Sequence, residues 1–510
     1  SGKTPTMNDA ASPMNDIDLG IGPIVLLVVY LCGMIGLGIL GRAKSEEKSL
    51  RDFYLGGSSF GLFVLFLTFF ATQYSGNTML GFAGRSYRAG GTYVVSILFM
   101  ALAICVLTFY GPRLYKLARI FGYITPADYI YHRFGSHALR IVCVLLFCWG
   151  LGNYILEQLV AMGHAVQGLS GGKIDFMAGV VMLVVVMLVY ESLGGMRSVA
   201  WTDAVQGVIL LIGCSAIFYI LVTNEGGLHA AAEIIQETRP EKYQVPDAPG
   251  IRNWISTILL LGFGVSVYPH AIQRVFSSKN LRTLQWSLSG MAFMPFVTTF
   301  LAFLIGIIAI SKYEALSTLQ SDQVTIYMLA EIININVFTY WLGVMVFVAL
   351  VAAIMSTSDS ALLSIQSMIT KDIYKPYINP DATPEHLLRV GKIFGWAMMA
   401  FLVTMAWVSI KTESSIWLLI KLKLEFMVQI APVFVIGVYS KRLPAKAVLA
   451  GILTGTAITL TFWIGEAVGI TIGQWGSIQR SPWNISAGVW GLAANFTICI
   501  IGTLTAPKHD

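Results

Sequence analysis

Residues 352–360 read AAIMSTSDS, a polar run inside the apolar segment 337–371, which is long enough to cross a lipid bilayer. On a helix, residues three, four and seven positions apart share one face. That face carries Ala353, Ser356, Thr357 and Ser360, with Asp359 beside it. Hydroxyl oxygens suit a small, hard cation, although small residues also let neighbouring helices pack closely. A carboxylate at the centre of a bilayer costs roughly 3 kcal/mol, so Asp359 favours a binding site over packing alone.

The composition predicts an all-α polytopic membrane protein. The 510 residues are 56% hydrophobic and 12% charged, with a mean hydropathy of +0.72. We count about thirteen candidate spans of the length that a bilayer requires, which leaves no room for a soluble domain of ordinary size. The net charge of +6 fits basic cytoplasmic loops, so we expect no nucleic-acid partner. The sequence contains no G-x-x-x-x-G-K-[ST] loop, which argues against ATP hydrolysis.

Charge also predicts the topology. Basic loops follow the first, third, fifth, seventh, ninth and eleventh spans. Because positively charged loops stay in the cytoplasm, we expect the N-terminus outside and the C-terminus inside. The expected segments are an external tail (1–19), an accessory first helix (20–41), a first five-helix repeat (60–222), an external loop with a short amphipathic helix (223–252), a second five-helix repeat (253–440), and two accessory helices with a short tail (441–510).

Two of the predicted spans are interrupted near their middle. The second span contains ATQYSGNT at residues 71–78, and the seventh contains GFGVSVYP at residues 262–269. Because these breaks lie five spans apart, we expect two inverted five-helix repeats whose unwound segments meet at mid-membrane and form the binding sites. A packing kink at Gly or Pro would explain either break alone, but two kinks at matching positions are a less economical explanation.

Several motifs resemble those of the bacterial sodium/solute symporters. They are DFYLGG at 52–57, GGMR at 194–197, TDAVQG at 202–207, the run 352–362 and KDIY at 371–374. The likeness covers nearly the whole chain. Within that family, the sequence resembles the pantothenate and proline carriers. The pantothenate carriers look closest, through Pro269-His270 followed by Arg274 and through the AAIMST run. The resemblance implies leucine-transporter-type inverted repeats and a multi-pass location in the inner membrane of a bacterium.

The resemblance also implies a sodium site between the second and ninth spans. Its ligands would be the backbone oxygens of Ala71, Tyr74 and Ala353 and the hydroxyls of Ser356 and Thr357. Neutral oxygen ligands of this kind suit Na⁺.

Some relatives hold a second sodium, which maps to Asp203, Ser356 and Ser360 in this sequence. Asp359 stands where those relatives have serine, which puts the second site in doubt. Its carboxylate could bind the ion, carry a proton, or pair with a basic side chain.

Residues near the two breaks are the candidates for substrate binding. They are Gln73, Ser75 and Thr78 in the second span, Glu157 and Gln158 in the fourth, and Tyr268 in the seventh. In relatives that bind carboxylates, the positions of Ser75 and Thr78 face the acid group, and a half-helix N-terminus there also favours an anion. Glu157 calls either for an ammonium on the substrate or for a basic partner in the protein. We expect a zwitterion such as an amino acid, with an organic carboxylate such as pantothenate as the alternative.

Charged residues inside the eleventh span have two explanations. Lys421 and Glu425 are four residues apart and could pair on one helix face, whereas Lys423 faces elsewhere, so that the three charges would line an outer or inner vestibule. Alternatively, all three reach a membrane interface along their aliphatic stems, which we consider the better explanation.

The leading hypothesis is a sodium-coupled secondary active symporter that imports a small polar solute by alternating access. Its partners would be the solute, the sodium ion and the lipid bilayer. A transporter-like solute sensor is a second hypothesis. An intramembrane enzyme with an Asp203 and Asp359 dyad is a third, but nothing in the sequence brings a scissile substrate to those residues, so we expect no enzyme.

Overall fold

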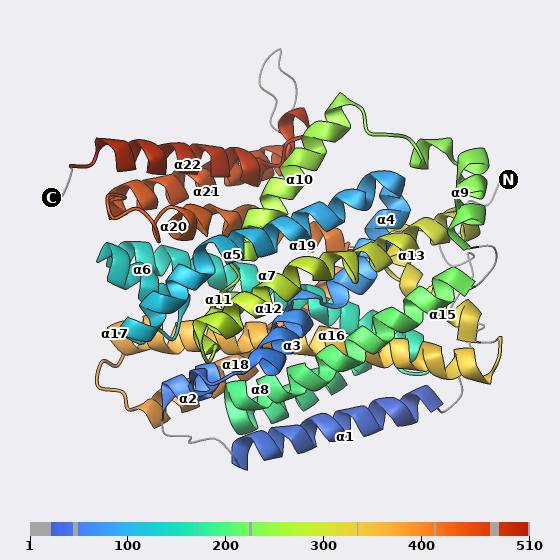
Figure 1. Cartoon of the computed structure of the whole chain (residues 1–510), viewed down its shortest axis with the longest axis horizontal. Coiled ribbons are helices and arrows are strands. Elements are labelled where there is room, and N and C mark those ends of the chain that lie inside the picture. The colour runs from blue at the N-terminus through green and yellow to red at the C-terminus, as the bar shows by residue number, and fades with distance from the viewer. Residues whose placement is uncertain are drawn as a thin grey trace.

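The computed structural model describes residues 22–43, 49–170, 172–223, 227–333, 335–412, 415–469 and 479–507, and these ranges are predominantly helical. They contain an isolated parallel bridge between Phe60 and Ser278 but no named β-strand. Helices such as α1, α16 and α22 run in nearly the same direction (Figure 1). In lipid, a helix satisfies its own backbone polar groups, so an all-helical bundle is the expected outcome. The predicted tail at 1–19 lies outside the described residues.

The helices of the first half of the chain are α1 (Gly22–Ala43), α2 (Leu50–Leu55), η2 (Gly56–Ser58), α3 (Leu62–Gln73), η3 (Asn77–Phe82), α4 (Ala83–Ala89), η4 (Gly90–Val94), α5 (Val95–Phe121), α6 (Pro126–Phe134), α7 (His137–Leu169) and α8 (Phe176–Thr223). Next come α9 (Gly227–Thr238), which confirms the amphipathic helix predicted in the loop, and η5 (Pro240–Lys242).

The helices of the second half are α10 (Ala248–Ser266), α11 (Pro269–Ser277), α12 (Leu281–Phe293), η6 (Met294–Phe296), α13 (Thr299–Lys312), α14 (Thr318–Asp322), α15 (Val324–Ile333), α16 (Val337–Met368), η7 (Ile369–Tyr374), α17 (Lys375–Tyr377), α18 (Pro384–Lys411), α19 (Ile416–Met427), η8 (Val428–Ile430), α20 (Ala431–Val435), α21 (Ala445–Val468), η10 (Pro482–Asn484) and α22 (Ala487–Thr505).

Both predicted breaks are present. Helix α3 ends at Gln73, the backbone is extended at Tyr74 (φ −104°, ψ 99°), and the π-helix η3 begins at Asn77. A glycine is required in this gap, because a Cβ at Gly76 would lie 2.3 Å from Cγ1 of Ile354 on α16. In the second repeat, α10 and α11 are bent by 47° where Pro269 starts α11. Proline has no backbone N–H, so the helix cannot continue unbroken through it.

The helix that carries the AAIMSTSDS run, α16, lies at the centre of the bundle. It packs against α8, α7, α3 and α1 from the first half of the chain and against α11, α15 and α18 from the second. From residue 343 to residue 368, almost every side chain is buried. The polar face of α16 is therefore enclosed by protein rather than exposed to lipid.

The predicted number of about thirteen spans is not confirmed. Within the described ranges, nine helices are long and apolar enough to cross a membrane, or ten if α10 and α11 count as one span. The predicted fifth and sixth spans form one helical run, α8, which is interrupted at Gly195. The half-helix Leu62–Gln73 is too short to count. Length and apolarity alone thus merge some spans and miss broken ones.

Gly195 provides a test of this packing. Its backbone has φ 53° and ψ −143°, and a Cβ there would lie 2.7 Å from the carbonyl oxygen of Phe53. We expect Gly195→Ala to lower the stability by about 1–3 kcal/mol, measured as the midpoint of thermal unfolding in detergent. Gly33→Ala is the matched control, because a Cβ at that position would have no atom of the described residues within 4 Å. Equal midpoints for the two variants would contradict the strain assigned to Gly195.

Candidate functional site

Oxygen atoms from α3 and α16 meet at the first break. The hydroxyl of Ser356 donates to the carbonyl oxygens of Ala71 at 2.9 Å and Ala353 at 3.1 Å. The hydroxyl of Thr357 lies 3.0 Å from the same oxygen of Ala353 and 3.5 Å from that of Ala71. All four residues are fully buried. Because α3 ends here, its last carbonyls carry partial negative charge, so the group can hold a small cation.

Four of the five residues predicted to bind sodium are therefore joined by hydrogen bonds. The fifth, Tyr74, follows in the extended segment, and its ring packs on Phe70 with 5.3 Å between the centroids. That the backbone oxygen of Tyr74 binds sodium stays a prediction. Tyr154 adds a residue that the sequence did not suggest for this region, because its hydroxyl donates to the carbonyl of Thr72 at 3.4 Å.

The residues predicted for a second cation surround an arginine. Arg274 from α11 forms an ion pair with Asp203 on α8, with 2.8 Å between Nη2 and Oδ2, and both side chains are fully buried. The same guanidinium donates to the hydroxyls of Thr68 and Ser360. Sequence reasoning used Arg274 only as part of a motif and missed its place here. Its positive charge already lies beside Asp203, and a second sodium stays a prediction.

Asp359 lies on the edge of this cluster. Its carboxylate accepts hydrogen bonds from the hydroxyl of Tyr190 at 2.6 Å and from that of Ser360 at 3.2 Å. Among the described residues, the ion pair of Arg274 goes to Asp203 rather than to Asp359. Asp203 and Asp359 thus belong to one cluster around Ser360, and within the described part of the chain the guanidinium forms its ion pair with Asp203.

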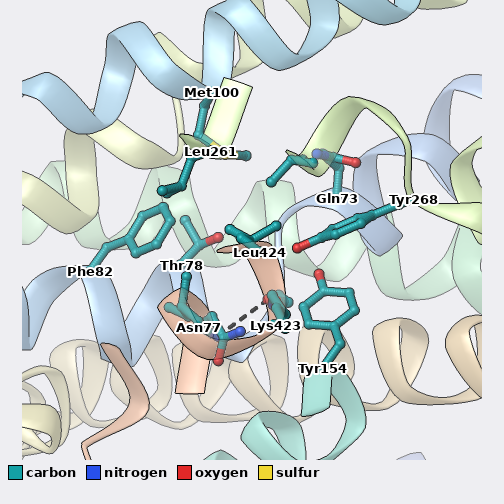
Figure 2. A pocket seen from close by; sticks show the side chains of 13 residues that line it. Gln73, Asn77, Thr78, Phe82, Met100, Tyr154, Leu261, Tyr268, Lys423 and Leu424 are labelled. Atoms are coloured by element: carbon teal, nitrogen blue, oxygen red, sulfur yellow. Dashed lines mark hydrogen bonds between the residues drawn. The ribbon is translucent and has the colours of Figure 1, made fainter. Parts of the chain in front are cut away.

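A narrow cavity of about 30 Å³ opens beside the first break (Figure 2). Its polar and aromatic lining residues are Gln73, Ser75, Asn77, Thr78, Tyr154, Tyr268 and Lys423. Its apolar lining residues are Phe82, Met100, Leu261, Val265, Ile420 and Leu424. Of the six residues predicted to bind substrate, four line this cavity: Gln73, Ser75, Thr78 and Tyr268. The lining, which combines hydrogen-bonding groups with apolar side chains, is of the kind found in small-molecule sites.

The other two predicted residues lie behind the cavity wall. The side-chain oxygen of Gln158 accepts from the backbone N–H of Gly76 at 3.1 Å, so Gln158 satisfies a donor that the break leaves free. Glu157 is fully buried and forms an ion pair with Lys423, with 2.7 Å between Nζ and Oε2. The counterion of Glu157 is therefore a basic side chain of the protein, Lys423, and not an ammonium group of the substrate.

Lys423 overturns the interpretation of the charges in α19. It is 1% exposed and therefore does not reach a membrane interface. Its Nζ lies 3.7 Å from the ring centroid of Tyr154 and 5.5 Å from that of Tyr268. Glu425 is also buried and accepts from the indole N–H of Trp463. Only the packing of α19 against α7 places Lys423 at the cavity, although a charge inside an apolar span is itself a signal of a functional position.

A broken helix with converging oxygens, a buried cavity beside it and two ion pairs at mid-bundle define a secondary transporter. The chain belongs to the sodium:solute symporter family, because the model of that family matches residues 53–455. It is a sodium-coupled solute symporter, and sodium is its coupling ion.

Individual relatives agree with this assignment. The chain is 25% identical to the osmoregulated proline transporter OpuE of Bacillus subtilis (strain 168), over 92% of this chain and 94% of the relative. It is 25% identical to the sodium/proline symporter of Salmonella typhimurium (86% and 87% covered) and 26% identical to the sodium/glucose cotransporter of Vibrio parahaemolyticus (88% and 86%).

A solved structure confirms the fold class. The substrate-bound, outward-open state of a Na⁺-coupled sialic acid symporter matches with a TM-score of 0.76 and 19% identity, over 96% of this chain and 98% of that one. The chain therefore has the all-α, leucine-transporter-type fold with inverted repeats that its two broken helices predicted.

The ion pair of Asp203 and Arg274 leads to a prediction. Removing one partner leaves a buried charge without its counterion, which costs about 3–5 kcal/mol. We expect Arg274→Met to lower the unfolding midpoint strongly, and the double variant Asp203→Asn with Arg274→Met to recover part of the loss. Arg442→Met is the control, because Arg442 is exposed. A double variant no more stable than the single one would contradict this assignment.

Proposed function

We propose that this chain imports a small zwitterionic solute with sodium held by Ala71, Tyr74, Ala353, Ser356 and Thr357. The observation that supports the ion site most directly is the convergence of two α16 hydroxyls on the carbonyl of Ala71, at 2.9 and 3.5 Å. These bonds are made between neutral groups, so an entering cation can take their place without first breaking an ion pair.

The position of this site explains how ion and solute would be coupled. Ala71 and Tyr74 belong to the proposed sodium site, and Gln73, Ser75 and Thr78 lie at the same break, at the end of α3, in the gap and in η3, and line the cavity. A sodium ion that bridges α3 and α16 would therefore hold these three side chains in place for the substrate. Each ligand would favour the same arrangement of the two repeats, which is the thermodynamic condition for coupled transport.

The zwitterion is proposed from the lining and from the relatives. The cavity is lined by hydrogen-bond donors, hydrogen-bond acceptors and apolar side chains. Two relatives are named as proline transporters. Import of an organic carboxylate such as pantothenate is the alternative, and a transporter-like sensor would bind the same solutes without moving them. We propose no enzymatic activity, because the family to which the chain belongs is a family of transporters.

The ion site is tested by uptake into proteoliposomes. We expect the double variant Ser356→Ala with Thr357→Ala to raise the sodium concentration for half-maximal uptake at least tenfold, because each lost ligand costs about 1 kcal/mol. Ser358→Ala is the matched control, since within the described part of the chain its hydroxyl bonds only to the carbonyl of Ile354 on its own helix, at 2.9 Å. The ion site would be refuted by uptake that does not depend on the sodium gradient. It would also be refuted if the double variant and the control needed the same sodium concentration for half-maximal uptake.

We further propose that the N-terminus is outside and the C-terminus inside the cytoplasmic membrane of a bacterium. Basic loops support this orientation. Val245 lies in the proposed external loop and is 88% exposed, whereas Arg442 lies in a basic loop and is also exposed. In intact cells, an impermeant maleimide should label Val245→Cys and leave Arg442→Cys unlabelled until the membrane is opened. The reverse pattern would invert the topology.

A further inference from the structure

The substrate cavity contains a buried ion pair that sodium coupling does not require. Lys423 on α19 lines the cavity, and Glu157 on α7 lies behind it, with side-chain exposures of 2% and 0%. Burying two charges costs several kcal/mol per ion before their attraction is counted. The two residues come from different predicted repeats. Neither forms one of the hydrogen bonds described above for the proposed sodium ligands. The ion pair therefore has a function separate from sodium binding.

Glu157 also determines how Asn77 is turned. One carboxylate oxygen of Glu157, Oε2, accepts from both the ammonium of Lys423 and the side-chain amide of Asn77. Because the NH₂ group of Asn77 is engaged by Glu157, its carbonyl oxygen is free to accept another bond. Asn77 lines the cavity, directly after the break that carries Ser75.

Two acceptors in this cluster have no donor. Neither Oδ1 of Asn77 nor Oε1 of Glu157 has a hydrogen-bond partner among the described residues, although their residues are only 4% and 0% exposed. Buried acceptors are nearly always paired in folded proteins. A ligand in the cavity that brings an N–H or O–H donor would satisfy Oδ1 of Asn77, which lines the cavity, and a simple carboxylate anion would not.

Lys423 provides hydrogen-bond donors and a positive charge. Its ammonium has three donors, of which Glu157 takes one, while the face of Tyr154 attracts the charge at 3.7 Å. A donor therefore remains for an anionic group of a ligand. The cluster as a whole is neutral, so it can accept a positive and a negative group together without leaving a net buried charge.

The other end of the cavity is apolar. Figure 2 shows Phe82, Met100 and Leu261 on one side, with Tyr154 and Tyr268 on the other. An uncharged hydrocarbon side chain would make apolar contacts with the first three residues, whereas a second charged group there would lose its hydration without a partner.

We propose that Lys423 binds the carboxylate of an α-amino acid with an apolar side chain, that Oδ1 of Asn77 accepts from its ammonium, and that Glu157 positions both residues from behind the wall. This assignment rests on the proposed function and deepens it. Lys423 and Asn77 are substrate-binding residues, and Glu157 is a positioning residue.

Matched ligands test the assignment by thermal shift of the full chain in detergent with sodium. The first trio is L-proline, pyrrolidine, which lacks the carboxylate, and cyclopentanecarboxylate, which lacks the amine. The second trio is L-valine, isobutylamine and isovalerate. We expect an amino acid to bind at least tenfold more tightly than both of its truncated analogues, because each analogue leaves a buried polar group unpaired.

Variants assign the two ends of the ligand. We expect Lys423→Met to reduce the preference for the amino acid over its amine at least tenfold, and Glu157→Gln to weaken amino acid binding at least tenfold. The stabilisation by sodium alone should change by less than twofold in both. The double variant Glu157→Gln with Lys423→Met removes both charges, so it should fold well and still lack the preference over the amine.

Three outcomes would overturn the assignment. They are an unchanged preference in the folded double variant, tighter binding of a carboxylate than of its amino acid, and no binding of either trio. In each case, stabilisation by sodium that depends on Ser356 and Thr357 would still support the proposed ion site. Loss of that sodium response in the unaltered chain would instead refute the proposed function.

Discussion

The contact between the broken end of α3 and the centre of α16 is the constraint on which the rest of the structure depends. A helix that stops inside a bilayer leaves carbonyl groups without partners, and each costs several kcal/mol unless protein or an ion satisfies it. The hydroxyls of Ser356 and Thr357 form hydrogen bonds with the carbonyl oxygen of Ala71. The approach is close enough that residue 76 must be glycine. The requirement that stabilises the break also gathers the oxygens of the proposed cation site.

Buried charge then ties the two repeats together. Asp203 on α8 pairs with Arg274 on α11, and Glu157 on α7 pairs with Lys423 on α19, so each pair joins a helix of the predicted first repeat to a helix of the predicted second. Movement of one repeat against the other must keep these pairs or exchange their partners, because an isolated charge in the bundle costs several kcal/mol.

Sequence reasoning succeeded where the signal is local. Gly76 and Pro269 mark the two breaks, and the spacing of Ser356 and Thr357 places both hydroxyls on one helix face, where the structure finds them. It failed for Lys423, which was expected at a membrane interface and instead lies buried against Glu157. The two residues are far apart in the sequence, and no helical periodicity links positions on different helices.

The amino-acid sequence by itself therefore determined the class of fold, the place of both breaks and the polar face of α16. These follow from apolar length, helical periodicity and the backbone chemistry of glycine and proline. Only the tertiary structure decided which charges meet, that Arg274 lies beside Asp203, and that Asn77 and Lys423 face one cavity. The physical reason is that pairing energy depends on distance and burial, and both are set when separate helices pack.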